Sequence, residues 1–105
     1  MKRKHFCLLL LVFLSFMRAN AQEGTVVLGT VLDETKEPMP GVTVAEKGTS
    51  NGTLTDVDGR YSIKLTSKDA VLVFRFLGYE TQEIKVGGQK DINLQLNPVA
   101  TELTE

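Results

Sequence analysis

The sequence predicts an all-β fold, a seven-stranded β-sandwich preceded by a signal peptide. Three observations support this. Short runs rich in β-branched or alternating apolar residues recur about every 8–12 residues, and turn-forming residues separate them. No window carries a helical 3.6-residue period of useful length. The runs begin only after an N-terminal segment with the features of a secretory leader.

The first 21 residues have the three parts of a signal peptide. Residues 2–5 form a positively charged N-terminal region, and residues 6–17 form an apolar run. Ala19 and Ala21 then place small residues at the two positions that a signal peptidase recognises. The run is about a dozen residues long, whereas a membrane-spanning helix needs roughly 20. We therefore expect cleavage after Ala21 rather than an uncleaved anchor. Cys7 lies inside the apolar run, which argues against a lipoprotein.

Removal of this leader changes the composition of the chain. It takes away four of the 12 Lys and Arg residues, leaving 8 against 13 Asp and Glu, and it removes the lone Cys and the lone His. We expect one domain over residues 22–98, with residues 99–105 as a tail or a truncated linker. An acidic domain without a basic stripe argues against nucleic acid and anionic membranes as partners.

The strands are expected where the apolar pattern is clearest. Tyr61, Ile63 and Leu65 alternate with polar residues and face inward. Residues 70–77 are the most apolar stretch and are typical of a central strand covered on both faces. The other expected strands occupy residues 24–32, 42–46, 53–55, 79–86 and 92–96.

Turn chemistry is expected between these strands. Asn51-Gly52 suits a turn with positive φ, and Asp56-Val57-Asp58-Gly59 suits a tight turn with Gly59 at the positive-φ position. Gly78 bends the chain after the central strand. The Gly-Thr pairs lack the strand–loop–helix context of a phosphate loop and are interpreted as strand entries and bulges: Gly24-Thr25, Gly29-Thr30, Gly48-Thr49 and Gly52-Thr53.

The residues after the leader offer little for catalysis. Without His and Cys there is no Ser-His-Asp triad, no Cys nucleophile and no zinc site of the usual N/S type. A carboxylate pair across a cleft needs more room than a sandwich of this size offers. The Asp56–Gly59 segment resembles the opening of a calcium loop, but position 67 is Ser where an EF-hand has Glu. We therefore expect no enzyme activity, no cofactor and no metal, with a weak calcium site as the alternative to a plain turn.

Aromatic residues could signal a sugar-binding platform. There is no Trp, and Tyr61, Phe74 and Phe76 fall on faces expected to point inward. Tyr79, at the bend after Gly78, is the one aromatic side chain expected to reach solvent. Packing over a sandwich edge is its simpler interpretation.

The order of short motifs resembles a known domain. It is similar to the carboxypeptidase-regulatory-like domain at the N-terminus of SusC/RagA-type TonB-dependent outer-membrane transporters of the Bacteroidota, over residues 24–97. The resemblance implies a transthyretin-like Greek-key sandwich on the periplasmic side of the outer membrane. The motifs that carry it are Gly29, Val31 and Asp33; Glu37 to Val42 with Val44; Lys47-Gly48-Thr49; Gly52-Thr53, Thr55-Asp56 and Asp58-Gly59 with Tyr61; and Val73-Phe74, Phe76 and Gly78-Tyr79.

This resemblance also implies a function: a non-catalytic interaction module, the leading part of a nutrient transporter or a stand-alone relative of it. Its expected partners are TonB, whose periplasmic part is typically basic, other periplasmic proteins, or the transporter barrel. Contact is expected through exposed strand edges or acidic loops. The candidate residues are Glu37, Asp56, Asp58 and Tyr79.

Two further alternatives remain open, a small-ligand or glycan-binding module and a structural or adhesive module. In the family, a short TonB-contacting stretch, a plug and a barrel follow this domain. The sequence stops at Glu105, so the chain is expected to be either a receptor fragment or a free copy of the leading domain.

Overall fold

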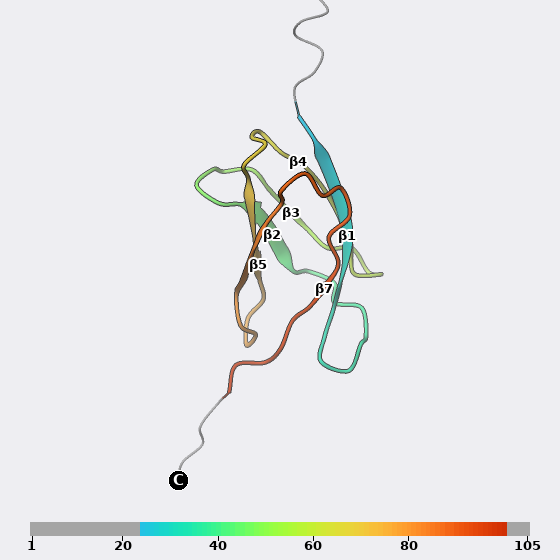
Figure 1. Cartoon of the computed structure of the whole chain (residues 1–105). Coiled ribbons are helices and arrows are strands. Elements are labelled where there is room, and N and C mark those ends of the chain that lie inside the picture. The colour runs from blue at the N-terminus through green and yellow to red at the C-terminus, as the bar shows by residue number, and fades with distance from the viewer. Residues whose placement is uncertain (1–23, 101–105) are drawn as a thin grey trace, which may run out of the picture.

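The computed structural model describes residues 24–100 (Figure 1). The predicted signal peptide lies outside this range. Within the range every element is a strand, so it holds no helix long and apolar enough to cross a membrane. The strands are β1 (Val26–Leu32), β2 (Thr43–Glu46), β3 (Gly52–Leu54), β4 (Arg60–Lys64), β5 (Val71–Arg75), β6 (Gln82–Lys85) and β7 (Leu94–Gln95).

These strands form two sheets that pack face to face. One has the order β4-β1-β7 and the other the order β3-β2-β5-β6. All neighbouring strands run antiparallel except β1 and β7, which run parallel. The described segment starts at one end of the sandwich and leaves at the other (Figure 1). The predicted all-β sandwich of seven strands is thus confirmed.

The pairing of β1 with β4 shows how the alternation builds the core. Val27 lies opposite Ile63, and both are buried, whereas their neighbours in the ladder point to solvent. Tyr61 packs edge-to-face on Phe74 of the other sheet, with ring centroids 5.5 Å apart. Tyr61, Ile63 and Leu65 face inward as predicted. The fully buried side chains that join the two sheets are Val27, Val31, Val42, Val44, Leu72, Phe74, Val86 and Leu96.

The central strand is shorter than the sequence predicts. Leu72, Val73 and Phe74 are buried in succession in β5, which lies between β2 and β6, so its cover on both faces is confirmed. The strand ends at Arg75, however. The next four residues form a turn closed by the Tyr79 amide donating to the Phe76 carbonyl at 3.0 Å. The prediction that Phe76 points inward is therefore wrong. Phe76 is 36% exposed, because it lies in the turn and not in strand β5.

The turns follow the predicted chemistry at one site and not at another. Gly59 adopts a φ of 72°, as expected. Between β2 and β3, however, the left-handed residue is Gly48, with a φ of 80°, and Gly52 begins β3 instead. The side chain of Asn51 explains the difference, because it donates hydrogen bonds to Glu46 and to the Lys64 carbonyl rather than shaping the turn.

The bond to Glu46 belongs to a network around a buried carboxylate. Glu46, at the end of β2, is only 2% exposed and accepts hydrogen bonds from Asn51 Nδ2 (3.0 Å), Thr66 N (3.0 Å) and Thr66 Oγ1 (2.8 Å). Burial alone raises the pKa of Glu46, but the bonds from Asn51 and Thr66 outweigh it and hold that pKa below its usual value. The network ties β2 to the β4–β5 loop, which connects the two sheets.

Gly29 has a packing role that its sequence context did not reveal. It sits mid-strand in β1, in regular register with Tyr61, so it is not the bulge or strand entry expected of it. The Tyr61 hydroxyl passes over it and donates to the Ile92 carbonyl at 2.7 Å. Burial, with a smaller contribution from Asp91, raises the pKa of Tyr61 to about 12. A side chain at position 29 would overlap the Ile92 carbonyl.

Candidate interaction surface

The loop from β1 to β2 is held in shape by one aspartate. Asp33 Oδ1 accepts hydrogen bonds from Thr35 Oγ1 (2.7 Å), Thr35 N (2.8 Å) and Glu37 N (3.0 Å). The bond from the Thr35 hydroxyl, followed by that from the Glu37 amide, lowers the pKa of Asp33. Lys36 takes a positive φ of 66° inside this loop. Glu34 and Glu37 are exposed on this loop, whose backbone is held by the hydrogen bonds to Asp33.

Tyr79 reaches this loop from the β5–β6 turn. Its hydroxyl donates to Glu34 Oε1 at 2.9 Å, which, with lesser help from burial and from nearby carboxylates, raises the pKa of Tyr79. Its ring packs edge-to-face on Phe76, with centroids 5.7 Å apart and an interplanar angle of 71°. Two rings at this angle do not form the flat platform that the glycan alternative needs. Tyr79 is half-buried and holds two loops together.

The turn from β3 to β4 is a second acidic loop with the same construction. Asp56 Oδ1 accepts hydrogen bonds from Asp58 N and Arg60 N, both at 2.9 Å, and Gly59 N donates to the Asp56 carbonyl. The carboxylate of Asp56 is thus occupied in shaping the turn. Val57, 82% exposed, and Asp58 point outward from its tip.

The two loops are neighbours. The Gly59 carbonyl accepts from Val31 N at 2.8 Å, and a Cβ at Gly59 would lie 3.1 Å from the Pro38 ring. Figure 1 shows both loops on the same side of the molecule, next to strand β1. We call residues 33–38 together with residues 56–60 the acidic loop surface. All four candidate residues therefore lie on it or, for Tyr79, against it.

The charge of this surface is not compensated by ion pairs. Within residues 24–100 the one salt bridge joins Lys47 to Glu83 at 2.9 Å, on the outer face of the other sheet. The acidic loop surface carries two basic residues, Lys36 and Arg60. Its acidic residues are Asp33, Glu34, Glu37, Asp56 and Asp58. A long-range attraction for basic partners follows from this distribution.

Exposed apolar side chains near the loops were missed at the sequence level. Leu77, at the tip of the β5–β6 turn, is 96% exposed, and Val57 is nearly as open. Val57 lies in the tight turn that the sequence predicts, but a single apolar residue between two aspartates gave no sign that its side chain points to solvent. Leu77 was absorbed into the predicted central strand.

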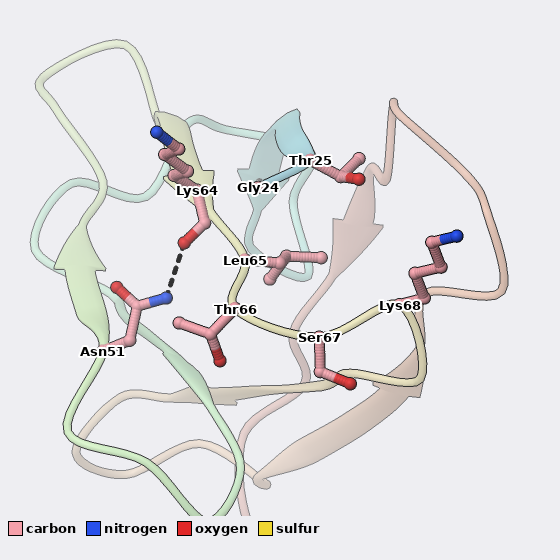
Figure 2. A pocket seen from close by; sticks show the side chains of 8 residues that line it. All are labelled: Gly24, Thr25, Asn51, Lys64, Leu65, Thr66, Ser67 and Lys68. Atoms are coloured by element: carbon pink, nitrogen blue, oxygen red, sulfur yellow. Dashed lines mark hydrogen bonds between the residues drawn. The ribbon is translucent and has the colours of Figure 1, made fainter. Parts of the chain in front are cut away.

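A hollow lies at the far end of the described residues from the acidic loop surface (Figure 2). It has a volume of about 630 Å³ and is lined by strand and loop ends from both sheets. Asn51 Nδ2 donates to the Lys64 carbonyl across it. Figure 2 shows the Lys64 and Lys68 side chains pointing away from one another, so their charges do not converge on one point. Among the described residues no group of three His, Cys, Asp or Glu side chains is placed to hold a metal ion.

Comparison with known proteins decides the family. The family model described as the CarboxypepD_reg-like domain matches residues 27–105. The chain belongs to this family. A CarboxypepD_reg-like domain is also part of the predicted resemblance, so that prediction is confirmed.

Curated relatives of this CarboxypepD_reg-like chain are TonB-dependent receptors. A TonB-dependent receptor of Formosa agariphila is 45% identical over 93% of the chain and 9% of its own length. The TonB-dependent receptor SusC of Bacteroides thetaiotaomicron is 42% identical over 80% of the chain and 8% of its own length. The chain thus spans less than a tenth of these relatives.

A solved structure supports the fold alone. The type II cohesin–X-dockerin complex of Acetivibrio cellulolyticus contains a chain that is 22% identical, with a TM-score of 0.58. The match covers 70% of this chain and 57% of that one. At this sequence identity the similarity concerns the β-sandwich fold alone and says nothing about a binding partner.

Proposed function

We propose that the chain is a non-catalytic interaction module of a TonB-dependent outer-membrane transporter of the SusC/RagA type, acting on the periplasmic side after export by residues 1–21. The observation that carries the proposal is the match to receptors such as SusC over most of the chain. The family to which the domain belongs and the receptor names of its relatives support transport rather than catalysis.

The acidic loop surface is the proposed contact site, and its proposed partner is the basic periplasmic domain of TonB. Two preformed loops carry same-sign charge with two exposed carboxylates, Glu37 and Asp58, whose side chains make no hydrogen bond in the described structure. Charges that are free on a rigid frame steer an oppositely charged partner without an ordering cost. Asp56 and Tyr79 support the surface by shaping it, whereas Glu37 and Asp58 face the partner.

Charge reversal on this surface should weaken binding. In calorimetric titrations of the purified protein with the periplasmic C-terminal domain of TonB, Glu37→Lys combined with Asp58→Lys is expected to reduce affinity by at least about tenfold. Wild-type affinity should also fall between about 0.05 M and about 0.3 M salt, because screening shortens the reach of exposed charges.

The control matches the change in net charge. Asp58→Lys alone is compared with Asp69→Lys, because each of these single substitutions changes the net charge by the same amount. The Asp69→Lys variant alters the β4–β5 loop, away from both acidic loops (Figure 1), and the Asp69 carboxylate makes no hydrogen bond in the described structure. This variant should bind within about twofold of wild type. Absence of binding by the wild-type protein at low salt contradicts the proposal. Equal losses in the Asp58→Lys and Asp69→Lys variants contradict the assignment to this surface.

A further inference from the structure

The outer edge of β6 offers main-chain groups to a partner, and we infer that it accepts an extended segment of another protein as a fifth strand of the four-stranded sheet. The inference rests on the proposed function only in expecting a protein partner. It concerns a different surface, because β6 belongs to the β3-β2-β5-β6 sheet and has β5 as its only neighbour there.

The register shows which groups are free. Val86 N donates to the Ala70 carbonyl, so within the ladder Ile84 and Gln82 exchange hydrogen bonds with β5. The alternate residues, Glu83 and Lys85, then direct their N–H and C=O groups away from β5. No backbone or side-chain hydrogen bond reaches these four groups from the described residues.

The edge of β4 is closed by contrast. Arg60 N donates to Asp56 Oδ1 and the Arg60 carbonyl accepts from Asp56 N, both at 2.9 Å. Further along, the Lys64 carbonyl accepts from Asn51 Nδ2 at 2.6 Å. Two side chains therefore clamp both ends of the β4 edge, and only Ser62 between them has both of its outward main-chain groups free.

The remaining two edges are also occupied or short. The Gln95 carbonyl of β7 accepts from Gln82 Nε2 at 2.9 Å. Beyond β7 the chain pairs with the turn before β6, where Glu80 N donates to Asn97 O and Val99 N donates to Gly78 O. Strand β3 has three residues. Its outward residues, Gly52 and Leu54, are unpaired as well, so β6, with four residues, is the longer of the two open sheet edges in the described chain.

The side chains along β6 define the partner's chemistry. Ile84 is half-buried against the core, so part of its side chain remains accessible to a partner. Glu83 is neutralised by Lys47, whereas Lys85 has no acidic partner among the described residues. Cross-strand neighbours interact directly and alternate between faces. The segment that fits places an apolar residue beside Ile84 and an acidic residue beside Lys85.

A peptide with that alternation tests the inference. The probe is the capped heptapeptide Thr-Val-Glu-Val-Glu-Val-Thr, added to the ¹⁵N-labelled purified protein and followed by amide shifts and hydrogen exchange. We expect saturable binding with the largest changes at Glu83 and Lys85, and slower exchange of these two amides. The same peptide with Lys in place of both Glu residues should bind more weakly.

Two substitutions at one position separate the main chain from the side chain. Glu83→Pro removes an N–H that β5 does not use, and proline is tolerated at such edge positions. We expect it to weaken peptide binding by about fivefold or more, the effect of one or two lost hydrogen bonds. Glu83→Ala keeps the N–H and should bind within about twofold of wild type. The amide spectrum of each variant reports whether the fold is retained.

The results distinguish this inference from the proposed function. The Glu37→Lys, Asp58→Lys protein should bind the peptide as wild type does. Absence of peptide binding, or equal binding by the Glu83→Pro and wild-type proteins, overturns the edge assignment even if TonB binds. Shifts confined to another strand, or a concentration-dependent dimer of the protein in place of peptide binding, overturn it as well.

Discussion

Gly29→Ala is expected to destabilise the domain by about 3 kcal/mol or more. The added methyl group would overlap the Ile92 carbonyl and lie 2.7 Å from the Tyr61 hydroxyl. Neither neighbour is the free end of a flexible side chain: one is backbone and the other is a buried ring that donates to it. The strand or the β6–β7 loop must move, and the Tyr61–Ile92 hydrogen bond is lost. Thermal unfolding should shift down by about 12 °C or more.

Gly52→Ala is the matched control for this substitution. Gly52 also lies in a strand without a positive φ, and the nearest atom to its added Cβ is the Val44 carbonyl at 3.3 Å. We expect a change below about 1 kcal/mol. If the Gly29→Ala protein unfolds at the same temperature as the wild-type protein, the β6–β7 loop does not pack against β1 as described.

Glu46→Ala is expected to cost about 3 kcal/mol, the usual effect of removing one member of a buried, charge-assisted network. It leaves Thr66 N and Thr66 Oγ1 without an acceptor between β2 and the β4–β5 loop. Chemical denaturation measures the loss as a lower midpoint. Glu83→Ala serves as control, because its salt bridge with Lys47 is exposed and contributes less than about 1 kcal/mol. Equal midpoints for the two variants would contradict the network.

The same carboxylate makes stability depend on pH. Because the pKa of Glu46 is lower in the folded protein than in the unfolded chain, the unfolded chain binds the proton more readily. Stability from Glu46 is therefore complete above about pH 4.3, the usual pKa of a glutamate. It is lost as the pH falls through the lower folded pKa. The free energy of unfolding of Glu46→Gln should change less across this window than that of wild type.

Local patterns predicted the strands well, because alternation is a property of neighbouring residues. Tyr61, Ile63 and Leu65 face the core as their spacing indicates. What escaped prediction depends on distant partners. Gly29 is explained by Ile92, and Asn51 serves Glu46 and Lys64 instead of a turn. No short window of sequence contains Gly29 together with Ile92, and Asn51 and Lys64 are 13 residues apart.

The candidate residues were predicted as a set, but not their division of labour. Acidic residues in turns suggested an interaction surface, and the fold places two such turns side by side at Pro38 and Gly59. Asp56 and Tyr79 are engaged in hydrogen bonds that shape the loops. Their roles required the geometry, because a turn-capping Asp and an exposed Asp look alike in sequence.

Mapping the TonB contact by amide shifts tests the central claim most directly. The ¹⁵N-labelled protein is titrated with the unlabelled periplasmic domain of TonB at low salt. We predict that the perturbed amides cluster in residues 33–38 and 56–60, and that the amides of the hollow around Lys64 and Lys68 stay unchanged. Perturbations centred on that hollow, or an unchanged spectrum at saturating TonB, would contradict an interaction module that works through its acidic loops.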